Sequence, residues 1–213
     1  LEAIRLTEQY AKERGQLLSF YNLKVKSELD NSNGRKYGLG SSGAVTVAKV
    51  KALNVFYDLE MDTLTQFKIA ALAHLAVQGN GSCGDIAASC YGGWIAFSTF
   101  DSQWVKEKQA QWSLSTLLET DWPMLSIQPL EVPKNLRLVI GWTGSPASNS
   151  DLVDQVHQSK EVAESAYQTF LKDSRECVEE MIAGFTNKNI PVIKQMITKN
   201  RALLNTLSSI TGV

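Results

Sequence analysis

Apolar residues recur at three- and four-residue intervals along most of this chain, and glycine-rich or polar segments separate the periodic stretches. This spacing places apolar side chains on one face of a helix. We expect helices over residues 2–18, 44–57, 62–77, 84–90, 113–120, 151–158, 160–184 and 190–210. Shorter segments alternate apolar and polar residues, which is typical of strands. Strands are expected over residues 20–29, 91–100, 125–132 and 136–142.

The order of these segments predicts an α+β fold in two parts that divide near Pro133. The second part contains two long amphipathic helices, and their apolar faces need a partner surface. We therefore expect this part to be incomplete within the 213 residues.

Composition and charge narrow the class of protein without identifying it. The chain is 44% hydrophobic and 20% charged, with a formal net charge of −1. It can bury a core and has no electrostatic bias toward nucleic acid or anionic membranes. Its longest apolar run, residues 69–77, is far shorter than the ~20 residues that span a bilayer. We expect neither nucleic acid nor a membrane as a partner.

The cysteines and histidines form no recognisable metal or catalytic pattern. Cys83, Cys90 and Cys177 lack Cys-x-x-Cys spacing, and their odd number argues against a disulfide framework. We expect reduced thiols and a cytoplasmic protein. His74 lies on an apolar stripe and is expected in the core, and neither it nor His157 has a partner at metal or triad spacing.

The most informative segment is a glycine-rich turn, residues 36–44, that runs directly into a predicted helix. Gly38 and Gly40 permit positive φ angles and close approach of a ligand, and the first N–H groups of the helix have no intrahelical partner. The helix dipole, two serine hydroxyls and the charge of Lys36 make this junction suited to phosphate. A tight turn with a serine N-cap is the alternative.

Residues 79–85 form a second glycine-rich turn before a segment that can start a helix. Asp85 then lies near a helix N-terminus, where the dipole keeps a carboxylate ionised. Beside a phosphate-binding loop, such a carboxylate can orient or deprotonate a substrate hydroxyl or a phosphate oxygen. The alternative is that Asp85 is an ordinary N-cap.

A third unusual segment, residues 141–150, follows a predicted strand and offers many small hydroxyl and amide donors. Such a loop suits a polar ligand. Ser, Asn, Gly and Pro are also the residues of solvated turns, so a plain connection is the alternative.

Taken in this order, the three segments resemble the GHMP kinase superfamily, and within it the phosphomevalonate branch. Gly-Leu-Gly-Ser-Ser at 38–42 is similar to the superfamily's ATP-phosphate motif. Lys-Tyr at 36–37, Gly-Asn-Gly-Ser-Cys-Gly-Asp at 79–85 and Gly-Trp-Thr-Gly-Ser-Pro-Ala-Ser at 141–148 are similar to the branch. The resemblance covers nearly the whole chain. It implies a Mg-ATP-dependent transfer of the γ-phosphoryl group to the phosphate of 5-phosphomevalonate.

The resemblance also implies a role for each motif residue. The ATP phosphates would be cradled by Gly38, Leu39, Gly40, Ser41, Ser42, Gly43 and Ala44. Ser42 would be the magnesium ligand, and Lys36 would offset charge between donor and acceptor. Ser82 and Asp85 would lie on the acceptor side. Further acceptor contacts would come from Ser148, Asn149 and Ser150, although the family more often has a small hydroxyl residue where Asn149 stands.

The two-domain GHMP kinase fold is implied as well. Residues 1–133 would form a partial N-terminal, ATP-binding domain with a ribosomal S5 domain 2-like fold, and residues 134–213 a partial, ferredoxin-like C-terminal domain. The superfamily's opening strand and its closing Gly-Ala-Gly-Gly-Gly run are absent from the sequence. We therefore expect the chain to be the inner portion of a longer kinase, incomplete at both ends and inactive by itself.

Two other interpretations remain open. Another kinase of the superfamily, such as a mevalonate kinase, would use an alcohol as acceptor, and basic residues at the acceptor site would favour a phosphorylated acceptor instead. A non-catalytic ligand-binding protein on the same fold would keep the loops without turnover, but binding alone would not require Lys36, Ser42 and Asp85 together. The oligomeric state is not predicted.

Overall fold

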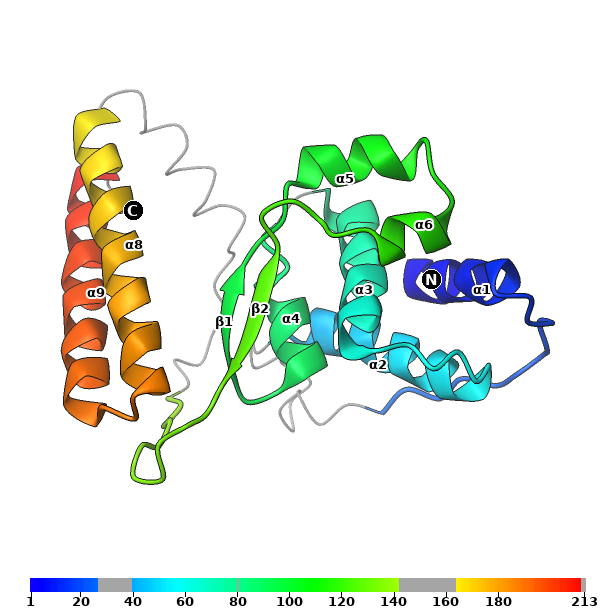
Figure 1. Cartoon of the computed structure of the whole chain (residues 1–213), viewed down its shortest axis with the longest axis horizontal. Helices are drawn as coiled ribbons and strands as arrows, with labels where there is room; N and C mark the ends of the chain where they lie inside the picture. The colour runs from blue at the N-terminus through cyan, green and yellow to red at the C-terminus, as the bar shows by residue number, and fades with distance from the viewer. Residues whose placement is uncertain (27–39, 80, 142–163, 212–213) are drawn as a thin grey trace. The chain divides into compact units, whose positions relative to one another are not determined.

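The computed structural model describes residues 1–26, 40–79, 81–141 and 164–211 (Figure 1). The chain divides into two compact units, Leu1–Pro129 and Leu130–Val213. The helices of the first unit are α1 (Glu2–Glu13), α2 (Ser41–Phe56), α3 (Thr63–Gln78), α4 (Gly84–Tyr91), α5 (Ser102–Gln109) and α6 (Leu114–Glu119). A two-stranded sheet is formed by β1 (Trp94–Ser98) and β2 (Ser126–Leu130). The second unit contains α8 (Glu164–Thr186) and α9 (Ile190–Thr211). The assignment of residues 1–133 and 134–213 to two GHMP domains stays a prediction.

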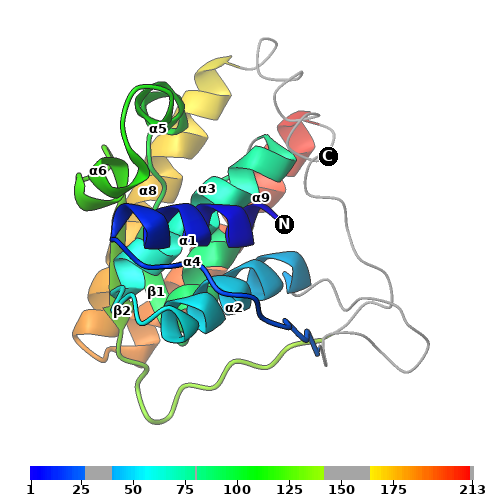
Figure 2. The same ribbon diagram turned by 90° about the vertical axis from the view of Figure 1, so that its right-hand side faces the viewer.

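Helix α3 is the central helix of the first unit and is contacted by α1, α2, α4 and α6 (Figure 2). Every residue from Phe67 to Leu75 is buried, as expected for a helix that is covered on all sides. The surrounding helices contribute fully buried side chains, among them Leu6, Val50, Leu53, Ile86 and Leu117. Each such side chain stabilises the fold by about 1.5–3 kcal/mol, so α3 organises the core of the unit.

Local signals set the ends of α3. The Asp62 carboxylate accepts a hydrogen bond of 2.7 Å from the Thr65 amide, and hydrogen bonding from Thr65 lowers the pKa of Asp62. At the other end the chain leaves the helix through Gly79, whose φ of 78° suits glycine. The predicted helix over 62–77 is thus confirmed. Those predicted over 44–57, 84–90 and 113–120 are also confirmed, with small shifts at their ends.

Lys68 is a buried cation on α3, only 2% exposed. Its Nζ donates two hydrogen bonds of 2.8 Å, to the carbonyls of Leu118 and Thr120 at the C-terminal end of α6. Burial lowers the pKa of Lys68, while the charges of Asp121 and Asp62 oppose that shift. The ammonium therefore satisfies carbonyls that a helix end otherwise leaves unpaired.

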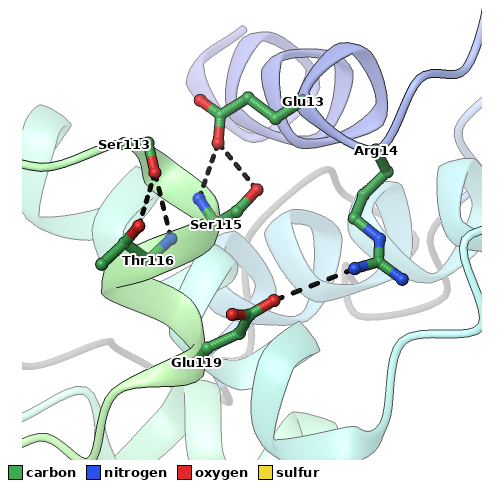
Figure 3. A network of polar contacts seen from close by, with 6 residues as sticks. All are labelled: Glu13, Arg14, Ser113, Ser115, Thr116 and Glu119. Atoms are coloured by element: carbon green, nitrogen blue, oxygen red, sulfur yellow. Dashed lines mark hydrogen bonds and ion pairs between the residues drawn. The ribbon is translucent and has the colours of Figure 1, made fainter.

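Figure 3 shows how the end of α1 is joined to the start of α6. Glu13 Oε2 accepts hydrogen bonds from the amide of Ser115 at 2.7 Å and from its hydroxyl at 2.8 Å. Glu13 Oε1 accepts a third, from the Leu114 amide at 3.2 Å. Ser113, the N-cap of α6, accepts from the Thr116 amide at 3.2 Å. The first three amides of α6 are thus all bonded to side chains.

Two of the predicted strands are wrong. Residues 20–26 and 136–141 have no regular secondary structure. Phe20 is fully exposed and Val139 is 88% exposed, and within the described parts of the chain neither segment joins the sheet. Alternating residues fit an extended backbone, but a strand forms only where a neighbouring strand completes its hydrogen bonds.

Other boundaries also differ from prediction. Helix α1 ends at Glu13 and not at residue 18, because the chain turns through Gly15 with a φ of 81°. Helix α5 was not predicted, although Asp101 caps it by accepting from the amides of Gln103 and Trp104 at 3.0 Å. The strands predicted over 91–100 and 125–132 are confirmed in shorter form as β1 and β2. The helix predicted over 151–158 lies outside the described residues.

Helices α8 and α9 of the second unit form a hairpin, which confirms two predicted helices (Figure 1). Cys177, Phe185, Ile193 and Met196 are buried in it. The Cys177 thiol donates to the carbonyl of Met196 at 3.2 Å. A Cβ atom on Gly184 would lie 3.0 Å from Ile193 Cγ1, so the glycine lets the two helices approach closely.

His74 lies in the core, as predicted. Cys83, Cys90 and Cys177 are free and buried, and His74 is buried in α3. Among the described helices, none combines the length and the apolar character needed to cross a membrane.

Candidate active site

Helix α2 begins at the first glycine-rich turn. Its N-cap is Gly40, in the left-handed conformation with φ 73° and ψ 31°, and the first intrahelical hydrogen bond runs from the Ala44 amide to the Gly40 carbonyl at 3.0 Å. The amides of Ser41, Ser42 and Gly43 therefore have no acceptor within the helix. No side chain caps this end in the described structure. The alternative of a serine N-cap is wrong, because glycine holds that position.

Helix α4 begins at the second glycine-rich turn. Its N-cap is Cys83, with φ 59° and ψ 21°, and Asp85 lies in the first turn of the helix. Asp85 is therefore near the helix N-terminus, as predicted, but is not the N-cap. The Ser82 hydroxyl accepts from the Gly84 amide at 3.3 Å. Burial first, and the Asp85 charge second, raise the pKa of Cys83 to about 12, so its thiol stays protonated.

The beginnings of α2 and α4 meet at Asp85. A Cβ atom on Gly43 would lie 2.6 Å from Asp85 Oδ2, and one on Gly40 would lie 3.5 Å from Asp85 Cβ. The missing side chains of two glycines thus leave the space that the Asp85 carboxylate occupies. The positive ends of two helix dipoles converge there, which favours anions.

Contacts between α2 and α4 hold these two helices together. Val47 and Val50 of α2 and Ile86 of α4 are buried in the same core. Farther along, Lys51 Nζ of α2 donates to the Cys90 carbonyl in the last turn of α4 at 2.9 Å. Because Lys51 pairs with the negative end of α4, the geometry around Asp85 is fixed from both ends of that helix.

The structure brings together part of the predicted site. Gly40 and Gly43 lie next to Asp85, and Ser82 belongs to the turn before Asp85. Ser41, Ser42 and Ala44 occupy the first turn of α2. The remaining predicted residues lie outside the described part of the chain: Lys36, Gly38, Leu39, Ser148, Asn149 and Ser150.

The oxygen atoms of Ser42 and Asp85 would suit a hard cation that takes its remaining ligands from phosphate and water. Within the described residues, no group of three or more acidic, histidine or cysteine side chains could hold a metal ion. Ser42 is exposed at the start of α2, and Asp85 supplies a carboxylate close to that turn. Magnesium commonly takes one or two protein oxygens and completes its shell with phosphate oxygens and water.

A cavity of about 330 Å³ beside Lys68 includes none of the predicted site residues.

Two residues that hold the second turn were not predicted from the sequence. Thr99 Oγ1 donates to the Ser82 carbonyl at 2.9 Å, and Lys106 Nζ donates to the Gly79 carbonyl at 3.1 Å. Neither residue belongs to a motif. The only local signal was Asp101, whose capping pattern could have indicated α5 and thus placed Lys106 on a helix.

Comparison with known proteins tests the resemblance to a family. Residues 2–93 match the family described as GHMP kinases N terminal domain. A phosphomevalonate kinase of Streptomyces sp. (strain CL190) is 36% identical over all 213 residues of this chain, which cover 57% of that protein. The resemblance to the GHMP kinase superfamily is therefore confirmed.

Two solved structures show the same fold. A Lin0012 protein from Listeria innocua is 43% identical with a TM-score of 0.94, covering 100% of this chain and 59% of that one. The Streptococcus pneumoniae phosphomevalonate kinase in complex with phosphomevalonate and AMPPNP is 31% identical with a TM-score of 0.83, covering 98% of this chain and 61% of that one. This chain has the GHMP kinase fold. It spans somewhat more than half the length of these relatives.

Proposed function

We propose that the protein containing this chain is a phosphomevalonate kinase. It would transfer the γ-phosphoryl group of ATP to the phosphate of 5-phosphomevalonate, giving 5-diphosphomevalonate and ADP in the mevalonate route of isoprenoid biosynthesis. The observation that carries the proposal is the contact between the Asp85 carboxylate and the glycines that open α2. Support also comes from the Streptococcus pneumoniae enzyme, whose structure holds phosphomevalonate and an ATP analogue on the same fold.

The start of α2 binds the donor in this proposal. The amides of Ser41, Ser42 and Gly43 point their N–H groups out of the helix end, and the dipole adds a positive field. Phosphoryl transfer needs charge stabilisation and alignment more than covalent participation by the protein, and such fixed donors supply both. Magnesium, when bound, would neutralise phosphate charge, with Ser42 as its ligand.

Ser82 and Asp85 act on the acceptor side. A phosphate monoester, whose second pKa is about 6, is already mostly ionised at neutral pH, so a strong general base is less necessary than for an alcohol. We therefore assign Asp85 mainly to positioning, through the metal or through Lys36. The residues outside the described structure keep the roles that the resemblance implies: Lys36, Gly38, Leu39, Ser148, Asn149 and Ser150. The free cysteines suit a cytoplasmic enzyme.

A coupled assay of ADP release tests the substrate. The intact protein is supplied with Mg-ATP and either 5-phosphomevalonate or mevalonate at equal concentrations. Turnover confined to 5-phosphomevalonate supports the proposal. Faster turnover with mevalonate would identify a mevalonate kinase, and binding of both ligands without ADP release would identify a non-catalytic protein.

Asp85→Asn is the matching test of the site. The amide keeps the shape of the side chain but removes the negative charge, so kcat should fall by about 100-fold or more while the fold stays intact. Circular dichroism and the urea midpoint check the fold. A variant within about threefold of the wild-type kcat would show that Asp85 only supports the first turn of α4.

A further inference from the structure

The turn that carries Ser82 includes one non-glycine residue in an unfavourable backbone conformation. Gly79 and Gly81 have φ angles of 78° and 125°, and Cys83 has a φ of 59°. A non-glycine residue in the left-handed region costs on the order of 1 kcal/mol, so it persists only where the surroundings hold it. The turn leads directly into α4 and Asp85, so a displacement of the turn would also displace the Asp85 carboxylate.

One continuous stretch, from the end of β1 into α5, supplies the contacts that hold this turn. Thr99 Oγ1 donates to the Ser82 carbonyl at 2.9 Å, and Lys106 Nζ donates to the Gly79 carbonyl at 3.1 Å. The ring of Phe97 lies under the turn, since a Cβ atom on Gly84 would be 3.7 Å from Phe97 Cδ1. Lys106 also places a positive charge at the C-terminal end of α3, where the helix dipole is negative.

We infer that Thr99 and Lys106 are positioning residues for the acceptor side of the site. They fix two carbonyls of the turn, and thereby set where Ser82 and Asp85 stand relative to the start of α2. This inference rests on the proposed kinase function. The hydrogen bond from Thr99 is solvent-exposed, so its loss should change stability little, whereas phosphoryl transfer is sensitive to small errors in alignment.

Thr99→Val in the intact protein is the first test, because valine keeps the shape and removes the donor. We expect kcat/KM for 5-phosphomevalonate to fall by about fivefold or more, with KM for ATP within about twofold of wild type. Thr99→Ser keeps the hydroxyl and should restore the wild-type value. Thr198→Val is the matched control, because Thr198 Oγ1 also donates to a carbonyl, that of Lys194 at 3.1 Å, on α9.

Lys106→Met is the second variant and does not depend on how Thr99→Val folds. It should lower kcat/KM for the acceptor in the same direction, without changing nucleotide affinity measured by calorimetry. The inference is overturned if both variants match the Thr198→Val control, or if KM for ATP rises as much as KM for the acceptor. A wild-type protein that does not turn over 5-phosphomevalonate would instead refute the proposed function, which separates the two failures.

Discussion

The N-termini of α2 and α6 solve the same physical problem in opposite ways. Each helix begins with amides that lack an intrahelical acceptor and with the positive end of a dipole. At α6, the carboxylate of Glu13 and the hydroxyl of Ser113 accept from the first three amides, and Figure 3 shows the contacts of Ser115 and Thr116. At α2, the N-cap is Gly40 and no side-chain cap is present in the described structure.

The difference supports our proposal that the start of α2 binds an anionic ligand. Glu13 comes from α1, and at neutral pH its carboxylate places a negative charge at the start of α6. Asp85 lies beside the start of α2 but belongs to the turn that we propose for the acceptor side, and the first amides of α2 remain suited to an anion from outside. The other end of α6 is also satisfied within the protein, because Lys68 donates hydrogen bonds to two carbonyls there. Changes at α6 should therefore reduce stability, and changes at α2 should reduce activity.

Among the variants that compare α2 with α6, the largest expected loss of activity comes from Gly43→Ala. The new Cβ would lie 2.6 Å from Asp85 Oδ2, so the carboxylate must move away from the start of α2. We expect kcat/KM to fall more than tenfold, equivalent to about 1.4 kcal/mol or more in the barrier. Alanine is favoured over glycine within a helix, so the free energy of unfolding should stay within about 1 kcal/mol of wild type. Steady-state kinetics and urea unfolding measure the two quantities.

Gly184→Ala is the matched control for this variant. Its Cβ would also be crowded, at 3.0 Å from Ile193 Cγ1, but within the hairpin of α8 and α9. Overpacking there should destabilise the protein by about 1–3 kcal/mol and leave the kinetics unchanged. Wild-type kinetics in Gly43→Ala would show that the contact between Asp85 and α2 has no part in catalysis.

Lys68→Met is expected to change stability alone and to leave activity unaffected. Methionine keeps much of the apolar length but leaves the carbonyls of Leu118 and Thr120 without their donor. Unfolding free energy should fall by about 2–3 kcal/mol, while KM for ATP is unchanged. Lys12→Met, at an exposed lysine in the last turn of α1, should change stability by less than about 1 kcal/mol. Equal stability of the two variants would mean that burying the Lys68 charge offsets what its hydrogen bonds contribute.

Local signals in the sequence were enough for most of the described helices. Capping residues, glycines and apolar spacing act over a few positions, so the ends of α3 and the start of α4 could be predicted. The wrong strand over 20–29 had the same kind of local pattern, and Phe20 shows the missing requirement, a partner that buries it. Pattern alone does not show whether a neighbouring strand exists.

Contacts between distant positions could not be predicted from a single sequence. Glu13 and Ser115 are 102 positions apart, and nothing in either segment indicates that they meet. Thr99 and Ser82 are 17 apart and belong to different elements. The resemblance to a family placed Asp85 near the phosphate loop, but the contact with Gly43 emerged only from the packing of α2 against α4.

The smallest expected effect is that of Glu13→Gln, and its pH dependence identifies the cause. Burial alone would raise the pKa of Glu13, but hydrogen bonds from Gln9, Ser115 and Leu114 outweigh it and hold the pKa below 4.5. A depressed carboxylate pKa stabilises the fold above the unfolded-state value, and that contribution is lost as pH falls through the folded-state value. Glutamine keeps one acceptor and loses the charge, so wild type should be more stable by about 1 kcal/mol at neutral pH.

This advantage of wild type over Glu13→Gln should be constant from neutral pH down to about pH 5 and then shrink below about pH 4.5 as Glu13 is protonated. Urea unfolding across this range measures it. The control is Glu119→Gln, at the other end of the same helix, where the carboxylate is 3.8 Å from Arg14 on the surface and should contribute little at any pH. A Glu13→Gln difference that persists undiminished at pH 3 would assign the loss of stability to side-chain shape. The charge of Glu13 at α6 could then not be compared with the anion that we propose at α2.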